Sequence, residues 1–237
     1  MRGLHLGGGV LVSLLASFAI SAQANAVPQL QRIIGKPLSA GAHPRDCGAQ
    51  AAAITWLMGG AAGVLTGAEA TPGRCDENHP PDPESVNLQG MVVEDALNKL
   101  VEIDQRYRWA EVDGVIVMRP LEAWSDATNP LSRPIDGFTM RDRNYRGALD
   151  LFRSALFVEP PSTTPDYEGS DELLRRKFSV NTQRGPSIDA LNTIVRAHGA
   201  LSWYVEYKTA PASIDGMVIH LHTFDNEGTL TQRHTQP

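Results

Sequence analysis

The sequence predicts an α+β protein made of two similar small modules, each with helices packed on a small sheet. The stretch SVNLQGMVVEDALN, which begins at Ser85, returns as SVNTQRGPSIDALN at Ser179. Each copy is followed by two extended runs with a turn between them. The resulting order of strand, helix, strand and strand is typical of α+β units.

The repeat extends well beyond chance similarity. Residues 85–109 and 179–203 align without gaps and share ten identities in 25 positions. The matched pairs include Asp95/Asp189, Leu97/Leu191, Asn98/Asn192 and Trp109/Trp203. A fainter echo relates GKPLS, from Gly35, to TNPLS, from Thr128. We interpret the pattern as an internal duplication.

Each copy contains a predicted helix with one buried stripe. Apolar residues recur at steps of three and four, as expected for a helix that packs on one face; they are Val93, Leu97, Leu100 and Val101 in the first copy and Ile188, Leu191, Ile194 and Val195 in the second. Ser187 is predicted to cap the second helix. The first copy has no polar cap at residues 91–92.

Extended runs complete each module. The first copy predicts strands over 107–112 and 115–118, because the Asp113-Gly114 pair between them is a strong hairpin signal. The second copy predicts strands over 201–207 and 218–224, joined by a longer loop. Upstream, a helix over about residues 47–58 leads into a strand within AGVLTGAEA.

The N-terminus has the layout of a secretory signal peptide. Arg2 precedes an apolar run over 10–20, and the segment closes on Ala24-Asn25-Ala26. A permanent membrane anchor is the alternative, but the apolar run is too short to span a bilayer. We therefore expect cleavage after residue 26 and a periplasmic or secreted protein. No later stretch is long and apolar enough for an integral membrane span.

Charge and cysteine content narrow the class further. The formal net charge is −6, and it becomes −7 without residues 1–26, which hold Arg2 and no acidic residue. An acidic exported chain is a poor candidate for nucleic-acid binding. Cys47 and Cys75 are the two cysteines. An even pair in an oxidising compartment predicts a structural disulfide.

The two copies divide the chain. We expect a first module over 27–120, a linker over 121–133, a second module over 134–224 and a polar tail over 225–237. The runs Glu94-Asp95-Ala96-Leu97 and Asp113-Gly114-Val115-Ile116-Val117 resemble the short N-terminal domain of secretins and TonB-dependent proteins, the STN or N0-like domain. Here the resemblance covers two tandem copies, without a barrel or a secretin core.

That resemblance implies a fold and a role. Members have a strand, a small-residue turn, a helix and a two-stranded hairpin, and they dock partner proteins in the periplasm without catalytic residues. The sequence agrees with the last point, because it holds no nucleophile or metalloprotease motif. We therefore expect a protein that is not an enzyme and has no cofactor.

Few side chains suggest a binding site. His220 and His222 would face the same side of a strand and are the candidate metal ligands, with His198 as a possible third ligand. We assign no metal to them. Trp109 and Trp203 are expected in the cores. Trp124, in the linker, is expected either to hold the modules together or to form part of a recognition surface.

The sequence thus predicts an exported, non-catalytic envelope protein that docks a partner protein. Its binding mode is addition of a strand at a sheet edge, although the sequence does not identify the free edge. One alternative is an envelope protein that binds a ligand or glycan. The other alternative is an enzyme with an unrecognised metal site at His220 and His222.

Overall fold

The computed structural model describes residues 27–40, 50–71, 86–157, 167–168, 171–208 and 212–224. The predicted signal peptide, Cys47 and Cys75, and the polar tail lie outside these residues. In chain order, the elements are η1 (Gln29–Gln31), β1 (Ser39–Ala40), α1 (Gln50–Ala62), β2 (Thr66–Glu69), β3 (Val86–Asn87), α2 (Val93–Ile103), β4 (Tyr107–Val112), β5 (Val115–Pro120), η2 (Glu122–Trp124), η3 (Pro130–Ser132), β6 (Pro134–Ile135), β7 (Thr139–Arg143), α3 (Tyr145–Leu156), β8 (Tyr167–Glu168), α4 (Asp171–Arg175), β9 (Phe178–Asn181), β10 (Gly185–Pro186), α5 (Ser187–His198), β11 (Leu201–Tyr207), η4 (Ile214–Gly216) and β12 (Met217–Thr223).

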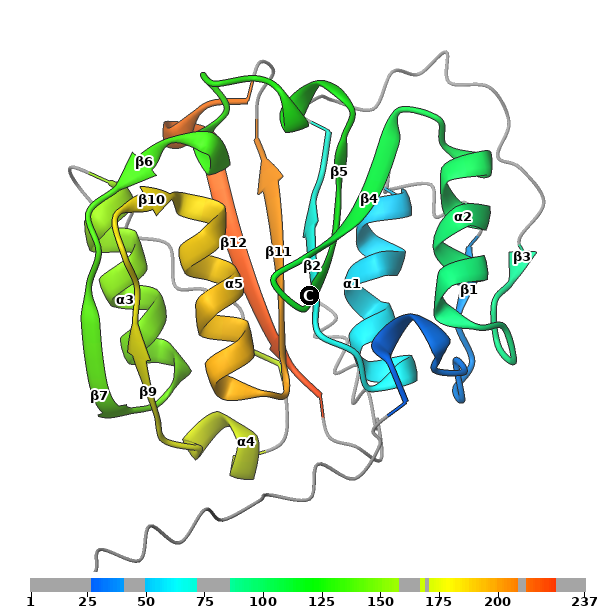
Figure 1. The fold of residues 1–237 in the computed structure, drawn as a ribbon, viewed down its shortest axis with the longest axis horizontal. Helices are drawn as coiled ribbons and strands as arrows, with labels where there is room; N and C mark the ends of the chain where they lie inside the picture. Colours follow the sequence, from blue (N-terminus) through cyan, green and yellow to red (C-terminus); the bar gives the residue numbers. More distant parts are fainter. Residues whose placement is uncertain are drawn as a thin grey trace, which may run out of the picture.

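One six-stranded sheet runs through the molecule in the order β4-β5-β2-β11-β12-β8 (Figure 1). The pairs β4–β5 and β11–β12 are antiparallel, whereas β5–β2, β2–β11 and β12–β8 are parallel. Three two-stranded sheets, β1-β3, β7-β9 and β6-β10, accompany it. The α+β class is confirmed. The continuity of the central sheet across both modules was not predicted.

The two halves of the chain, residues 27–120 and 134–224, use the same pairing scheme. In the first half, β1 pairs with β3, while β2, β5 and β4 form one end of the central sheet. In the second half, β7 pairs with β9, while β8, β12 and β11 form the other end. The shared scheme is what the sequence repeat leads one to expect. Descent of the halves from one duplicated module, and the predicted domain boundaries, stay predictions.

Each half has its own hydrophobic core, and the two cores lie on opposite faces of the sheet. On β5, Ile116 and Met118 pack in the core that contains α1 and α2. The alternate residues Val115 and Val117 pack in the core that contains α3 and α5. Successive strand residues point to opposite faces, so the helix pairs cover opposite faces. Figure 1 shows α2 beside β1 and β3 at one end, and α3 beside β7 and β9 at the other.

The predicted helices and hairpin are confirmed. Leu97 and Leu191 are both 0% exposed, and each lies in the core of its own half. Asp113 and Gly114 form the turn between β4 and β5 with φ angles of 50° and 75°, as a two-residue hairpin of type I′ requires. The helix expected over about 47–58 is described from Gln50 and continues to Ala62.

One predicted cap is wrong. Ser187 is the first residue of α5, and Pro186 occupies the N-cap position without a side-chain hydrogen bond. The Ser187 hydroxyl donates instead to the Pro130 carbonyl at 2.9 Å. The serine side chain therefore attaches the linker to α5. Local sequence gave no sign of this because the two residues are 57 positions apart.

Within the described residues, no helix combines the length and the apolar character needed to cross a membrane.

Candidate functional site

The joint between the halves is a parallel pairing of β2 with β11. All four residues of β2 are buried. The register places Trp203 opposite Gly67 and Val205 opposite Glu69, and the Ala70 amide donates to the Val205 carbonyl at 2.8 Å. On the other face of the sheet, side chains also bond across the joint. The Thr66 hydroxyl donates to the Ser202 hydroxyl at 2.9 Å.

Trp203 lies over β2, and only a glycine leaves room for it. A Cβ atom built at Gly67 would overlap the Trp203 indole at Cε2, Cζ2 and Nε1. Trp203 is 0% exposed, and its indole N–H donates to Asn192 Oδ1 on α5 at 2.9 Å. The joint therefore combines backbone pairing between β2 and β11 with packing of the Trp203 indole against Gly67, which has no side chain.

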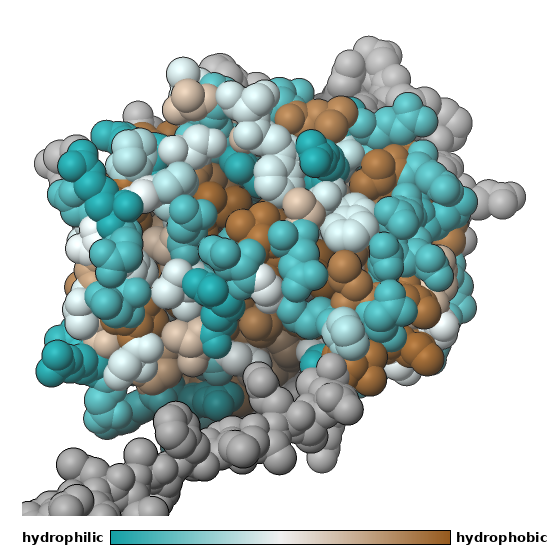
Figure 2. All heavy atoms as spheres, in the orientation of Figure 1, coloured by the Kyte–Doolittle hydropathy of each residue, from teal (hydrophilic) through white to brown (hydrophobic). Residues whose placement is uncertain are grey.

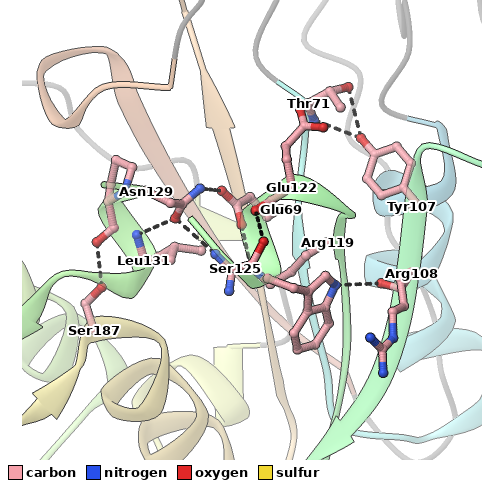
Figure 3. A network of polar contacts seen from close by, with 12 residues as sticks. Glu69, Thr71, Tyr107, Arg108, Arg119, Glu122, Ser125, Asn129, Leu131 and Ser187 are labelled. Carbon is pink, nitrogen blue, oxygen red and sulfur yellow. Dashed lines mark hydrogen bonds and ion pairs between the residues drawn. The ribbon is translucent and has the colours of Figure 1, made fainter. Parts of the chain in front are cut away.

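A buried polar network closes one end of this joint (Figure 3). Glu69, at the end of β2, accepts three hydrogen bonds, and Figure 3 shows how Arg119 and Asn129 lie around its carboxylate. Arg119 Nε on β5 donates to Oε2 at 2.6 Å, while Asn129 Nδ2 and the Tyr207 hydroxyl donate to Oε1 at 2.6 and 2.8 Å. Arg119 Nη2 also donates to Asn129 Oδ1 at 3.0 Å. One carboxylate thus connects the first half, the linker and the second half.

This network is sealed from solvent. Glu69, Arg119 and Asn129 are 1%, 3% and 4% exposed. Burial raises the pKa of Tyr207 far above its usual range, and the neighbouring Glu69 charge raises it further. A buried ion pair persists when hydrogen bonds satisfy its remaining atoms, and those bonds are present here. The arrangement holds the halves in a fixed relation and exposes no reactive group.

The linker folds over the network. Asn129 Oδ1 accepts a hydrogen bond from the Leu131 amide at 2.8 Å, which caps η3. The Trp124 ring lies 5.6 Å from the Arg119 guanidinium and 5.9 Å from that of Arg108. Its indole N–H donates to the Arg108 carbonyl at 3.3 Å. Both guanidinium groups belong to the first half, and the Trp124 ring also packs against the core that contains α3 and α5. The two roles expected for Trp124 both stay predictions.

The edge strand β4 occupies in the first half the position that β11 occupies in the second, but nothing described pairs with its outer side. Tyr107 lies opposite Pro120, which has no N–H, so this pair is not hydrogen-bonded. Hydrogen-bonded and non-bonded pairs alternate along an antiparallel ladder. The backbone N–H and C=O groups of Tyr107, Trp109 and Glu111 therefore point away from β5.

Trp109 repeats the arrangement of Trp203 at this edge. Its indole N–H donates to Asn98 Oδ1 on α2 at 3.1 Å, in the same place as the bond from Trp203 to Asn192. However, Trp109 is half-buried and Asn98 is exposed, whereas Trp203 and Asn192 are both 0% exposed. The described part of the chain has no strand on β4 to cover Trp109 as β2 covers Trp203.

His220 and His222 do face the same side of β12, but they contact aromatic rings. The Trp56 ring lies 5.2 Å from the His222 ring and 6.5 Å from the His220 ring, and it stacks on Tyr204 at 5.5 Å. His220 Nε2 lies 3.0 Å from Glu206 Oε1, a contact that lowers the pKa of Glu206. Burial lowers the pKa of His222.

His198 does not join this pair. It lies at the end of α5, on the opposite face of the sheet, where its ring packs edge-on against Phe178 at 5.2 Å. Its Nε2 atom is 3.2 Å from the Leu173 carbonyl. Among the residues that the structure describes, no three His, Cys, Asp or Glu side chains are grouped so that they could hold a metal ion.

The sequence repeat matched Trp109 with Trp203 and Asn98 with Asn192. In the structure, each tryptophan bonds to the asparagine of its own copy. Sequence reasoning missed Glu69 and Arg119. One signal was available: Glu69 is a carboxylate inside the apolar run VLTGAEA, and Arg119 ends the apolar strand VIVM. A charge within a buried strand needs a partner of opposite charge. The pairing itself depends on tertiary structure that the local pattern does not contain.

Comparison with known proteins gives no relative: no family model, no curated protein and no solved structure matches this chain.

Proposed function

We propose that the protein is a non-catalytic docking module of the cell envelope and that it binds a partner protein by adding a strand to the outer edge of β4. One observation carries the proposal. The same position in the second half, β11, takes the strand β2, so the chain itself contains an example of the binding mode. The signal-like segment 1–26 and the resemblance to STN domains support an envelope location.

The character of the exposed surface supports binding through backbone groups. Among the described residues, the exposed large apolar side chains are Val27, Ile33 and Leu121, and none of them belongs to β4. Figure 2 shows apolar residues interspersed with hydrophilic ones on this face of the molecule. A partner that binds by strand addition gains main-chain hydrogen bonds and does not need a large apolar patch.

Charged side chains limit indiscriminate pairing at this edge. Arg108 and Glu111 are exposed on β4, and charges on an edge strand discourage contact with other edges. The outward Tyr107 N–H donates to the Asp104 carbonyl at 3.2 Å, whereas the outward N–H and C=O groups of Trp109 and Glu111 have no backbone partner among the described residues. The edge is therefore open to a partner whose side chains fit those of β4.

The test uses a proline on the outer side of β4. Glu111→Pro removes one outward N–H and leaves the β4–β5 ladder intact, because position 111 does not bond to β5. Glu111→Ala is the matched control. Cross-linking in envelope extract should capture a protein that, once identified and purified, binds the wild type and Glu111→Ala directly. It should not bind Glu111→Pro.

A folded Glu111→Pro variant that binds the same purified protein with unchanged affinity would overturn docking at β4. Thermal unfolding of the variants shows whether they are folded. The metal-dependent alternative is addressed by the same preparation, because stoichiometric metal that is lost in a His220→Ala/His222→Ala variant would contradict a non-catalytic role.

A further inference from the structure

We propose that the strand docked on β4 runs parallel to β4 and carries a glycine opposite Trp109. The proposal rests on the docking function above and specifies which strand fits. The internal joint supplies its geometry, because β2 runs parallel to β11 and places Gly67 opposite Trp203.

The first step concerns the tryptophan side chains. Both donate the indole N–H to an asparagine eleven residues earlier, at 3.1 Å for Trp109 and 2.9 Å for Trp203. The asparagines lie on α2 and α5, which hold equivalent places in the two halves. A directional bond to the same helix position fixes both indoles in the same orientation. The Trp109 ring therefore extends over the outer side of β4 as the Trp203 ring extends over β2.

The second step concerns the space under the ring. At the internal joint, a Cβ atom at Gly67 would overlap the Trp203 indole, so the residue opposite the tryptophan must be a glycine. A strand that docks on β4 in the same register meets the Trp109 ring in the same way. A larger residue would have to displace the ring and break its bond to Asn98.

The third step concerns charge. Two residues after the glycine, the docked strand lies opposite Glu111, as Glu69 lies opposite Val205 at the internal joint. Glu111 is exposed on β4, and opposite charges on facing strand positions are favourable. A lysine or arginine fits this position better than an acidic residue. The preferred partner strand therefore has glycine and, two positions later, a basic residue.

These requirements argue against a second copy of this chain as the partner. The outer strand of the second half is β8. Leu221 pairs with Trp203 as Met118 pairs with Trp109, so Leu221 and Met118 are equivalent. Tyr167 lies opposite Leu221 and Ala68 lies opposite Met118, which makes Tyr167 equivalent to Ala68. By this register, the position equivalent to Gly67 is Asp166, which lies outside the described residues. The position equivalent to Glu69 is Glu168. In the sequence, Asp166 and Glu168 do not match the preferred glycine and basic residue, so a second copy of this chain is not the expected partner.

The experiment appends a strand to the full chain. A copy of residues 64–71 with Glu69→Lys in the copy, reading VLTGAKAT, is joined to the C-terminus through a flexible Gly/Ser linker of about 30 residues, which gives an effective concentration of about millimolar. The matched control carries Gly67→Val in the copy. The amide and indole NMR signals of Trp109 and the amide signal of Glu111 report binding. NOEs between the two strands report the strand direction.

We expect the glycine copy to shift the β4 signals with parallel NOEs, and the valine copy to bind at least about tenfold more weakly. Trp109→Ala should remove the difference between the two copies. Equal binding of both copies to the protein with Trp109 intact would overturn the glycine requirement and leave docking at β4 standing. Absence of β4 shifts with either copy would overturn the proposed strand.

A second copy is a separate outcome of sedimentation measurements on the unmodified protein. Self-association that Glu111→Pro abolishes and Glu111→Ala retains would overturn the choice of a foreign strand. The docking function fails by another observation, unchanged binding of the purified partner to folded Glu111→Pro, so the two failures are distinguishable.

Discussion

The two halves of the molecule place the same residues in the same local arrangement but give them different neighbours. Trp203 and Asn192 are both 0% exposed under the joint, while Trp109 is half-buried and Asn98 is exposed at the outer edge. The difference is the strand β2, which covers β11 and has no described counterpart on β4. One half thus uses this edge for internal strand pairing, whereas the described residues place no strand on the matching edge of the other half. Three measurements test this contrast.

The largest expected effect separates the two tryptophans. Trp203→Ala should lower the free energy of unfolding by about 3–5 kcal/mol, because it empties a fully enclosed site between β2 and α5. Trp109→Ala should cost only about 1–2 kcal/mol, because its ring is already partly in water. Urea denaturation of both variants measures the difference. If both variants lose the same free energy of unfolding, pairing with β2 does not make Trp203 more important for stability than Trp109.

The next effect concerns the polar network at the joint. Glu69→Gln keeps the size of the side chain and one acceptor but leaves the Arg119 charge without its counter-ion. The expected loss is about 3 kcal/mol, since the buried guanidinium is then unpaired. Glu111→Gln, on the exposed part of β4, is the matched control and should change stability by less than about 0.5 kcal/mol. If both variants lose similarly little free energy of unfolding, the Glu69 ion pair does not stabilise the joint between the halves.

Much of the secondary structure of each half could be predicted from local sequence patterns, whereas the contacts that join the two halves could not. The three- and four-residue spacing of Leu97 and Leu191 placed both helices, and Asp113-Gly114 placed the hairpin, because these signals lie within a few residues of the structure that they determine. Glu69 and Tyr207 are 138 positions apart. Nothing in the sequence near either residue indicates the other.

The cap predicted at Ser187 shows the same limit on a smaller scale. Serine before a helix favours capping in isolation, but the Pro130 carbonyl is within 2.9 Å and takes the hydroxyl. Tertiary contact thus redirected a side chain whose local preference was clear. Gly67 is a further case. A glycine is needed there because of the Trp203 indole, which is far away in the sequence.

The smallest expected effect is a pH dependence that belongs to the second half. His198, at the end of α5, occupies the position of Asp104 in the first half. Burial lowers the pKa of His198 below its ordinary value of 6.5, so the folded protein resists the proton that the unfolded chain accepts. Stability from this group is therefore complete above about pH 6.5 and is lost as the pH falls towards the folded pKa.

His198→Gln retains a donor for the Leu173 carbonyl, which lies 3.2 Å from the histidine ring nitrogen, and it does not titrate. The wild type should lose more stability than this variant when the pH falls from about 7.5 to about 5.5. Urea denaturation at both pH values measures the two losses. If the losses are equal, His198 is protonated as readily in the folded core as in the unfolded chain. The acid sensitivity of the second half would then not come from His198.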